Sequence, residues 1–145
     1  MTTTSPTYAF GTTVDLPLDE AIAAITAALK EEGFGILTQI DVAATLQQKL
    51  NVSFEPYVIL GACNPSLAHQ ALTLVHDIGL LLPCNVVVHA HGARSRIDVA
   101  DPIAMLGLIP NPRLAPIAQQ ARERLYRAVQ TLGAVDSAEY AATAG

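Results

Sequence analysis

The 145-residue sequence contains no tryptophan, two cysteines and few charged residues. Charged side chains make up 14% of the chain, whereas hydrophobic ones make up 51%. A small domain has a large surface for its volume, and this chain has few charged side chains to place on that surface. We therefore expect part of the apolar surface to meet a second copy of the chain, so the composition predicts a homodimer.

Two cysteines are too few for a disulfide framework. They leave three roles, which are buried small side chains, a metal or cofactor site, and redox-active thiols. Neither a Gly-x-Ser-x-Gly motif nor a Cys-x-x-Cys pair is present. The cysteines are therefore the main candidates for a chemical role.

The sequence also lacks a long hydrophobic run. The longest uncharged apolar stretch, residues 78–90, is interrupted by Gly79, Pro83 and Asn85 and is shorter than the roughly 20 residues that cross a bilayer. The N-terminal residues, MTTTSPTYAF, have neither the basic nor the apolar region of a signal peptide. These features predict no membrane span and a cytoplasmic location.

Basic residues are scarce, and the formal net charge is −5. Four of the eight, Arg113, Arg122, Arg124 and Arg127, fall in one C-terminal segment together with Glu123. This mixture is typical of the solvated face of a helix. We therefore expect no nucleic acid among the partners.

The length predicts a single domain, which we place at residues 8–133. Residues 1–7 are polar and are predicted to be disordered. Residues 134–145 have no hydrophobic periodicity and are predicted to form a mobile tail.

Hydrophobic periodicity predicts interleaved strands and helices. Strands are expected at 8–14, 34–40, 57–62, 84–91 and 94–99, and helices at 17–33, 42–50, 65–78, 102–106 and 112–133. Gly92-Ala93 suits a type II′ turn, which would pair His91 with Arg94 in an antiparallel hairpin. The fold class is therefore α+β, with a sheet of about five strands and helices packed on one face.

Cys63 and Cys84 each lie where an apolar run meets a turn, and an asparagine follows each of them. Asn64 and Pro65 have the residue types of a helix cap and a first helical position. Cys63 would then lie beside a helix N-terminus, where the dipole favours a thiolate. Asn64 and Asn85 could each orient a sulfur or a ligand by hydrogen bonding.

The distance between the two cysteines depends on topology. If the helix from Pro65 connects parallel neighbouring strands, the thiols lie about 20 Å apart. They meet only if residues 80–82 bring the chain back, or if a partner subunit supplies the second thiol. The sequence leaves both arrangements open.

His89 and His91 alternate onto the same side of a strand, about 7 Å apart, and such a pair can hold a metal ion. Cys84, Val86 and Val88 point to the opposite side. The histidines are therefore a weaker metal-binding candidate than the cysteines, and the two pairs cannot form one compact site on a regular strand.

Several short motifs together resemble a bacterial and archaeal family known as domain of unknown function 302. They are Gly33-Phe34-Gly35, Ile40-Asp41, Leu60-Gly61-Ala62-Cys63-Asn64-Pro65, Leu82-Pro83-Cys84-Asn85 and Asp101-Pro102. The resemblance covers residues 8–133 and is to the subgroup with cysteines in both central motifs. It implies a small α+β domain with a curved, mainly antiparallel sheet like that of TATA-box-binding protein, paired as a homodimer. It implies no established activity, and Val42 stands where many relatives have a histidine.

Two functions from different classes follow. The first is a dimeric binding protein in which Cys63, Asn64, Cys84 and Asn85 line a site for a soft metal ion, a haem-like cofactor or a reactive sulfur species. Apolar walls that exclude water are expected from Val58, Leu60, Val86 and Val88. The alternative is a thiol redox enzyme or carrier, with Cys63 as nucleophile and Cys84 as resolving thiol. A third hypothesis is a purely structural dimer.

Overall fold

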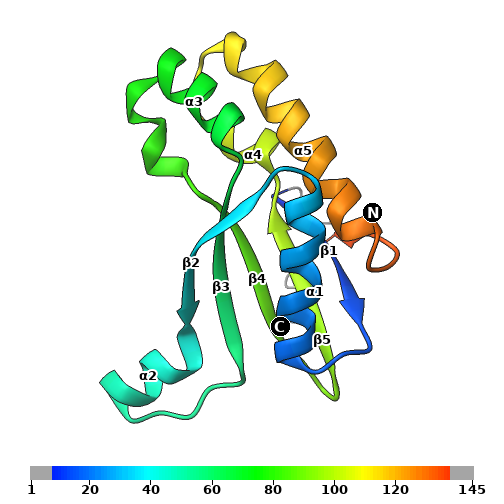
Figure 1. Ribbon diagram of the computed structural model, residues 1–145. Helices are drawn as coiled ribbons and strands as arrows, with labels where there is room; N and C mark the ends of the chain where they lie inside the picture. The colour runs from blue at the N-terminus through cyan, green and yellow to red at the C-terminus, as the bar shows by residue number, and fades with distance from the viewer. Residues whose placement is uncertain (1–7, 138–145) are drawn as a thin grey trace, which may run out of the picture.

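The computed structural model describes residues 8–137, so the expectations for residues 1–7 and 138–145 lie outside the described residues. Six strands form one sheet in the order β2-β3-β4-β5-β1-β6, and every neighbouring pair is antiparallel (Figure 1). The strands are β1 (Ala9–Val14), β2 (Gly35–Asp41), β3 (Tyr57–Cys63), β4 (Cys84–His91), β5 (Arg94–Ala100) and β6 (Asp136–Ser137). The predicted α+β class with an antiparallel sheet is confirmed.

Each α-helix overlaps a segment for which the apolar periodicity predicts a helix, although several of the bounds differ. The helices are α1 (Leu18–Glu31), α2 (Val42–Leu50), α3 (Pro65–Leu74), α4 (Pro102–Leu106) and α5 (Ala115–Gln130), with 3₁₀ turns η1 (His76–Leu81) and η2 (Pro112–Leu114). Asp41, Asn64 and Asp101 each cap a helix, accepting a hydrogen bond from a backbone N–H of the first turn. In the described chain, no helix combines the length and apolar character that crossing a membrane requires.

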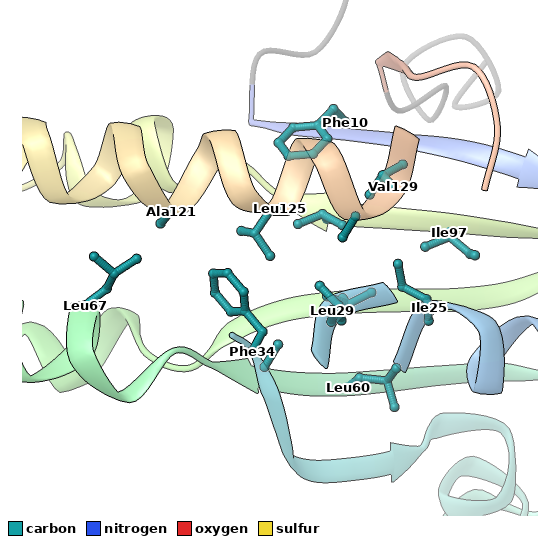
Figure 2. Close-up of a cluster of buried hydrophobic side chains, with 14 of the residues drawn as sticks. Phe10, Ile25, Leu29, Phe34, Leu60, Leu67, Ile97, Ala121, Leu125 and Val129 are labelled. Carbon is teal, nitrogen blue, oxygen red and sulfur yellow. The ribbon is translucent and has the colours of Figure 1, made fainter. Parts of the chain in front are cut away.

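The core lies between one face of the sheet and helices α1 and α5. Ile25 and Leu29 of α1 meet Leu125 and Val129 of α5, and these four side chains are almost completely buried (Figure 2). The sheet contributes a matching row of buried apolar residues, which are Leu60, Val86, Val88, Ile97 and Val99. Burying each such side chain stabilises the fold by roughly 1.5–3 kcal/mol. This layer therefore holds the strands in place against the helices, and with them the strand ends.

The β4–β5 hairpin has the predicted register, with His91 opposite Arg94. Gly92 has a φ of 64°, whereas Ala93 does not have positive φ. This combination is the one that a type II′ turn requires, because only its first central residue is left-handed.

The helix that begins at Pro65 is shorter than predicted. It ends at Leu74, Val75 adopts extended backbone angles, and η1 follows as a separate turn. Thr73 donates its hydroxyl to the carbonyl of His69, a bond that competes with helix geometry, and β-branched Val75 is a poor helix former. The break allows the chain to turn back, so that β4 runs antiparallel to β3.

A sixth strand was not predicted. Asp136 and Ser137 pair with β1 at one edge of the sheet, within the segment predicted to be a mobile tail. Two residues are too few to show a period, and the strand is held by distant partners: Arg96 binds Asp136, and the Thr12 hydroxyl donates to the Ala134 carbonyl at 2.8 Å.

The face of the sheet away from α1 carries a buried ion pair on β5. The Nε and Nη2 atoms of Arg96 donate to Oδ1 of Asp98 at 3.0 and 2.9 Å. Both residues are at most 5% exposed. Four hydrogen-bonding partners compensate the guanidinium for its loss of water, and they are Asp98, Asp136, Thr13 and the Ser137 carbonyl.

Candidate ligand-binding site

The antiparallel pairing of β3 and β4 brings the two cysteines to the same end of the sheet. Cys84 lies opposite Ala62, and Cys63 is the next residue along β3. Directly opposed Cα atoms are about 5 Å apart and one strand residue adds about 3.4 Å, so we estimate about 6 Å between the two cysteine Cα atoms. Of the two arrangements that the sequence left open, the structure therefore has the one in which the chain returns through residues 80–82.

A cavity of about 270 Å³ lies at this end of the core. Its walls come from α3, η1, the first residues of β4, α4 and α5, and they are mainly apolar. Leu67 of α3 and Ala121 of α5 point toward each other here, with Phe34 beside them (Figure 2). The cavity thus continues the space between sheet and helices beyond the close-packed core.

All four residues singled out from the sequence, Cys63, Asn64, Cys84 and Asn85, contribute to the cavity wall. Asn64 is buried, and its Oδ1 accepts a hydrogen bond from the Leu67 N–H at 3.2 Å. Asn85 is exposed. The polar part of the wall therefore consists of a buried amide that starts α3, two half-buried thiols and one exposed amide.

Burial raises the pKa of both thiols. The pKa of Cys84 rises to about 11, first because burial disfavours the thiolate and second because a charge on Cys63 would repel it. Burial alone raises the pKa of Cys63. Both residues are free cysteines. The expected thiolate at Cys63 is not favoured, because desolvation outweighs the helix dipole and Asn64 itself binds an N–H of the first turn.

The apolar walls predicted from Val58, Leu60, Val86 and Val88 lie elsewhere. These residues face the helices, but they are buried in the core and do not line the cavity. Figure 2 shows Leu60 near Ile25 and Leu29 of α1. The predicted wall residues therefore belong to the close-packed core.

Residues of α4 and α5 supply the wall instead, and the sequence analysis missed them. They are Pro102, Met105, Leu106, Ile117 and Ala121, together with Ala100 at the end of β5. Asp101-Pro102 is a signal that could have found them, because it marks a helix beginning directly after the strand beside β4.

The structure does not bring His89 and His91 to the cavity. His89 is buried, stacks on Tyr57 with ring centroids 5.6 Å apart, and has its Nδ1 2.9 Å from the Ala90 carbonyl. His91 is exposed, and the residues opposite the two histidines are Arg96 and Arg94. From residue 8 to residue 137, no group of three or more His, Cys, Asp or Glu side chains is placed to hold a metal ion.

Comparison with known proteins gives the family. The crystal structure of an uncharacterized conserved protein DUF302 from Bacillus stearothermophilus superposes with a TM-score of 0.81 at 31% identity, over 88% of this chain and 99% of that one. No curated protein matches the chain. The model of the family described as domain of unknown function DUF302 matches residues 10–132. The chain therefore belongs to the DUF302 family.

Proposed function

We propose that the protein binds a small, uncharged and mainly apolar molecule in the cavity beside Cys63 and Cys84. The observation that carries this proposal is the cavity itself, about 270 Å³ with apolar walls and a few polar groups in one part of them. Protein interiors are otherwise close-packed, and small-ligand sites are concave, mainly apolar and largely pre-formed.

The volume limits the size of the ligand. An apolar cavity of about 150 Å³ holds benzene, and pockets for drug-sized ligands begin near roughly 300 Å³. The ligand is therefore somewhat larger than benzene. A haem-like cofactor is much larger than this space, so the proposal does not include it.

The thiols favour a neutral ligand over a metal ion. A closed zinc site takes about four ligands as thiolates, imidazoles or carboxylates, whereas the described wall offers only the two cysteines. Their raised pKa values also oppose the thiolate form that a metal needs. Of the ligand classes that the sequence suggested, an uncharged sulfur species is the one that needs neither thiolate ligands nor the space of a haem, and it would need an organic group to fill this cavity.

The raised pKa values also argue against the thiol redox alternative. A nucleophilic cysteine reacts as its thiolate and usually has a lowered pKa. Here burial raises the pKa of Cys63, the proposed nucleophile, and that of Cys84, the proposed resolving thiol. We therefore propose binding rather than catalysis.

Thermal unfolding in the presence of uncharged probes such as indole and p-cresol tests this function. Ala68 lines the cavity, so Ala68→Trp should fill it, whereas Gln70→Trp adds the same side chain at an exposed position of α3. We expect a saturable rise in Tm for the wild type and Gln70→Trp, and none for Ala68→Trp. A rise of equal size in all three proteins, or in none of them, contradicts the proposal.

A cytoplasmic location and the absence of nucleic acid among the partners stay predictions from the sequence. Staining for the full-length protein in fractionated cells tests the first. Electrophoretic mobility of DNA and RNA with added protein, measured at low salt, tests the second.

A further inference from the structure

The segment formed by β2 and α2 is only partly covered by the rest of the described chain. No residue of α2 is buried, and every residue of β2 except Ile36 is exposed. In Figure 1 α2 extends away from the sheet beyond β2. An isolated helix of this length is marginal in water, since helices shorter than about 12–15 residues gain most of their stability from packing.

This arm, which we define as residues 42–54, carries exposed apolar side chains. Leu50, Val52 and Phe54 are 65%, 43% and 48% exposed. Exposed apolar residues gathered on one projecting segment mark an interaction surface.

The outer edge of β2 offers backbone groups for pairing. Among the described residues β2 has one neighbouring strand, β3, and it forms an end of the sheet. Residues 35–40 contain neither a charge nor a proline, which are two of the devices that prevent edge-to-edge pairing. A third device, a bulge, is present, because the register of β2 against β3 shifts between Ile36 and Thr38. Leu37 lies on this edge strand and is 66% exposed.

The direction of β2 determines what a second copy would bring to this edge. Gly35 pairs with Cys63 at the cavity end, and Asp41 pairs with Val58 at the end that leads into α2. If two copies pair their β2 strands about a two-fold axis, the strands run antiparallel. The Asp41 end of each copy then lies beside the Gly35 end of the other, so each arm reaches the partner's cavity end.

The two surfaces that this symmetry brings together are complementary. The cavity end presents Leu72 of α3 and Leu80 of η1, which are 40% and 85% exposed. The arm has one charged residue, Lys49, and the segment from α3 to η1 also has one, Asp77. An apolar surface with a cation thus meets an apolar surface with an anion.

We infer that this chain forms a two-fold dimer through antiparallel pairing of its β2 strands, and that each arm covers the mouth of the partner's ligand cavity. The cavity part of this inference rests on the function proposed above. The complete binding site then belongs to two chains, with the thiol-lined walls from one subunit and its cover from the other.

The first test is the molar mass of the full chain in solution, measured by light scattering after size exclusion. The wild type should have twice the 15.3 kDa of one chain. Leu37→Lys places a charge on the β2 edge and should give monomers. Leu108→Lys is the matched control, because Leu108 is 71% exposed but lies after α4, away from β2, and this variant should stay dimeric. Ile40→Lys is a second edge variant in case Leu37→Lys does not fold.

The second test asks whether the partner's arm covers the cavity mouth, and it measures the rate at which iodoacetamide labels the thiols. Labelling should be several-fold faster in monomeric Leu37→Lys than in the dimeric wild type. Leu50→Ser alters the arm, and at concentrations where it is dimeric its labelling rate should approach that of the monomer.

A monomeric wild type, or a dimer that Leu37→Lys and Ile40→Lys leave intact, overturns the inference. If the dimer depends on β2 but Leu50→Ser does not change the labelling rate, the claim that the arm covers the partner's cavity is wrong. Failure of the ligand proposal is separate: no apolar probe would then bind the wild type or the monomer, whereas mass and labelling would still decide the assembly.

Discussion

Cys84 lies directly opposite Ala62 in the β3–β4 ladder, and this pairing places both cysteines at the end of the sheet where the core opens into a cavity. The position follows from the turn back through η1 and not from any property of the cysteines. The thiols are therefore part of an apolar wall, and their chemistry is that of partly buried, protonated groups.

Cys84 should make stability depend on alkaline pH. The pKa of this thiol rises from its ordinary value of 9.0 to about 11 in the folded protein, so the folded state binds the proton more tightly than the unfolded state does. The contribution of this thiol to the free energy of unfolding is fully present below about pH 9. It falls as pH rises toward 11, by as much as about 2 kcal/mol after allowance for partial exposure. Urea unfolding of the wild type and Cys84→Ala from pH 8 to 10.5 should give curves that converge or cross as pH rises.

Cys63→Ala is the control for this experiment. Cys63→Ala keeps the Cys84 thiol, whose pKa is raised mainly by burial, so this variant should keep most of the part of the pH dependence that comes from Cys84. Parallel curves for the wild type and Cys84→Ala would show that the Cys84 thiol is not desolvated in the fold.

Asn64→Ala should destabilise the protein by about 1–2 kcal/mol, because the Leu67 N–H loses its partner in a buried place. Asn111→Ala removes a similar bond, from Asn111 Oδ1 to the Arg113 N–H, at an exposed turn and should cost less. Urea unfolding measures both. Asn64→Asp, which keeps the acceptor oxygen, should recover much of the loss, and equal costs for the two alanine variants would contradict the structural role of Asn64.

Gly61→Ala should disturb the strand end that carries the site. A Cβ at this position would lie 2.8 Å from Cγ of Pro83 and would also meet the Thr38 hydroxyl. Pro83 directly precedes Cys84, so we expect a cost of about 1–3 kcal/mol in unfolding free energy together with weaker probe binding. Gly79→Ala is the control, since nothing lies within 4 Å of its added Cβ, and it should leave both quantities nearly unchanged.

Arg96→Met should destabilise the fold by about 3–5 kcal/mol, because it leaves the buried carboxylate of Asp98 without its counter-charge. Asp98→Asn in the same chain should reduce that cost, so the double variant is expected to lose less than the sum of the single ones. Urea unfolding of the four proteins gives the coupling free energy. Additive losses would mean that the two side chains do not stabilise each other.

The elements of this fold that depend on neighbouring residues could be predicted from the sequence. Gly92-Ala93 determines a turn and Asn64-Pro65 begins a helix, because the preferences involved act within a few residues. The family motifs also indicated the fold, and the family match confirms that resemblance.

Features that depend on distant partners could not be predicted. The two-residue strand at Asp136 is held by Arg96, forty residues earlier in the chain. The break at Val75 decides whether β4 returns beside β3, yet Ile78 continues the apolar spacing of the helix and hides the break. The residue types at Cys63 and Cys84 suggested a shared site. The residues of α4 and α5 that complete its wall were missed, because they are distant from the cysteines in the sequence.

Chemical-shift mapping on ¹⁵N-labelled protein, titrated with indole or p-cresol, tests the central claim most directly. Binding in the cavity should give saturable shifts at the amides of Ala62, Leu67 and Ala71, which line it, and Ala68→Trp should abolish them. Shifts confined to other surfaces, or no saturable shift with any probe, would contradict the claim that this cavity is a ligand-binding site.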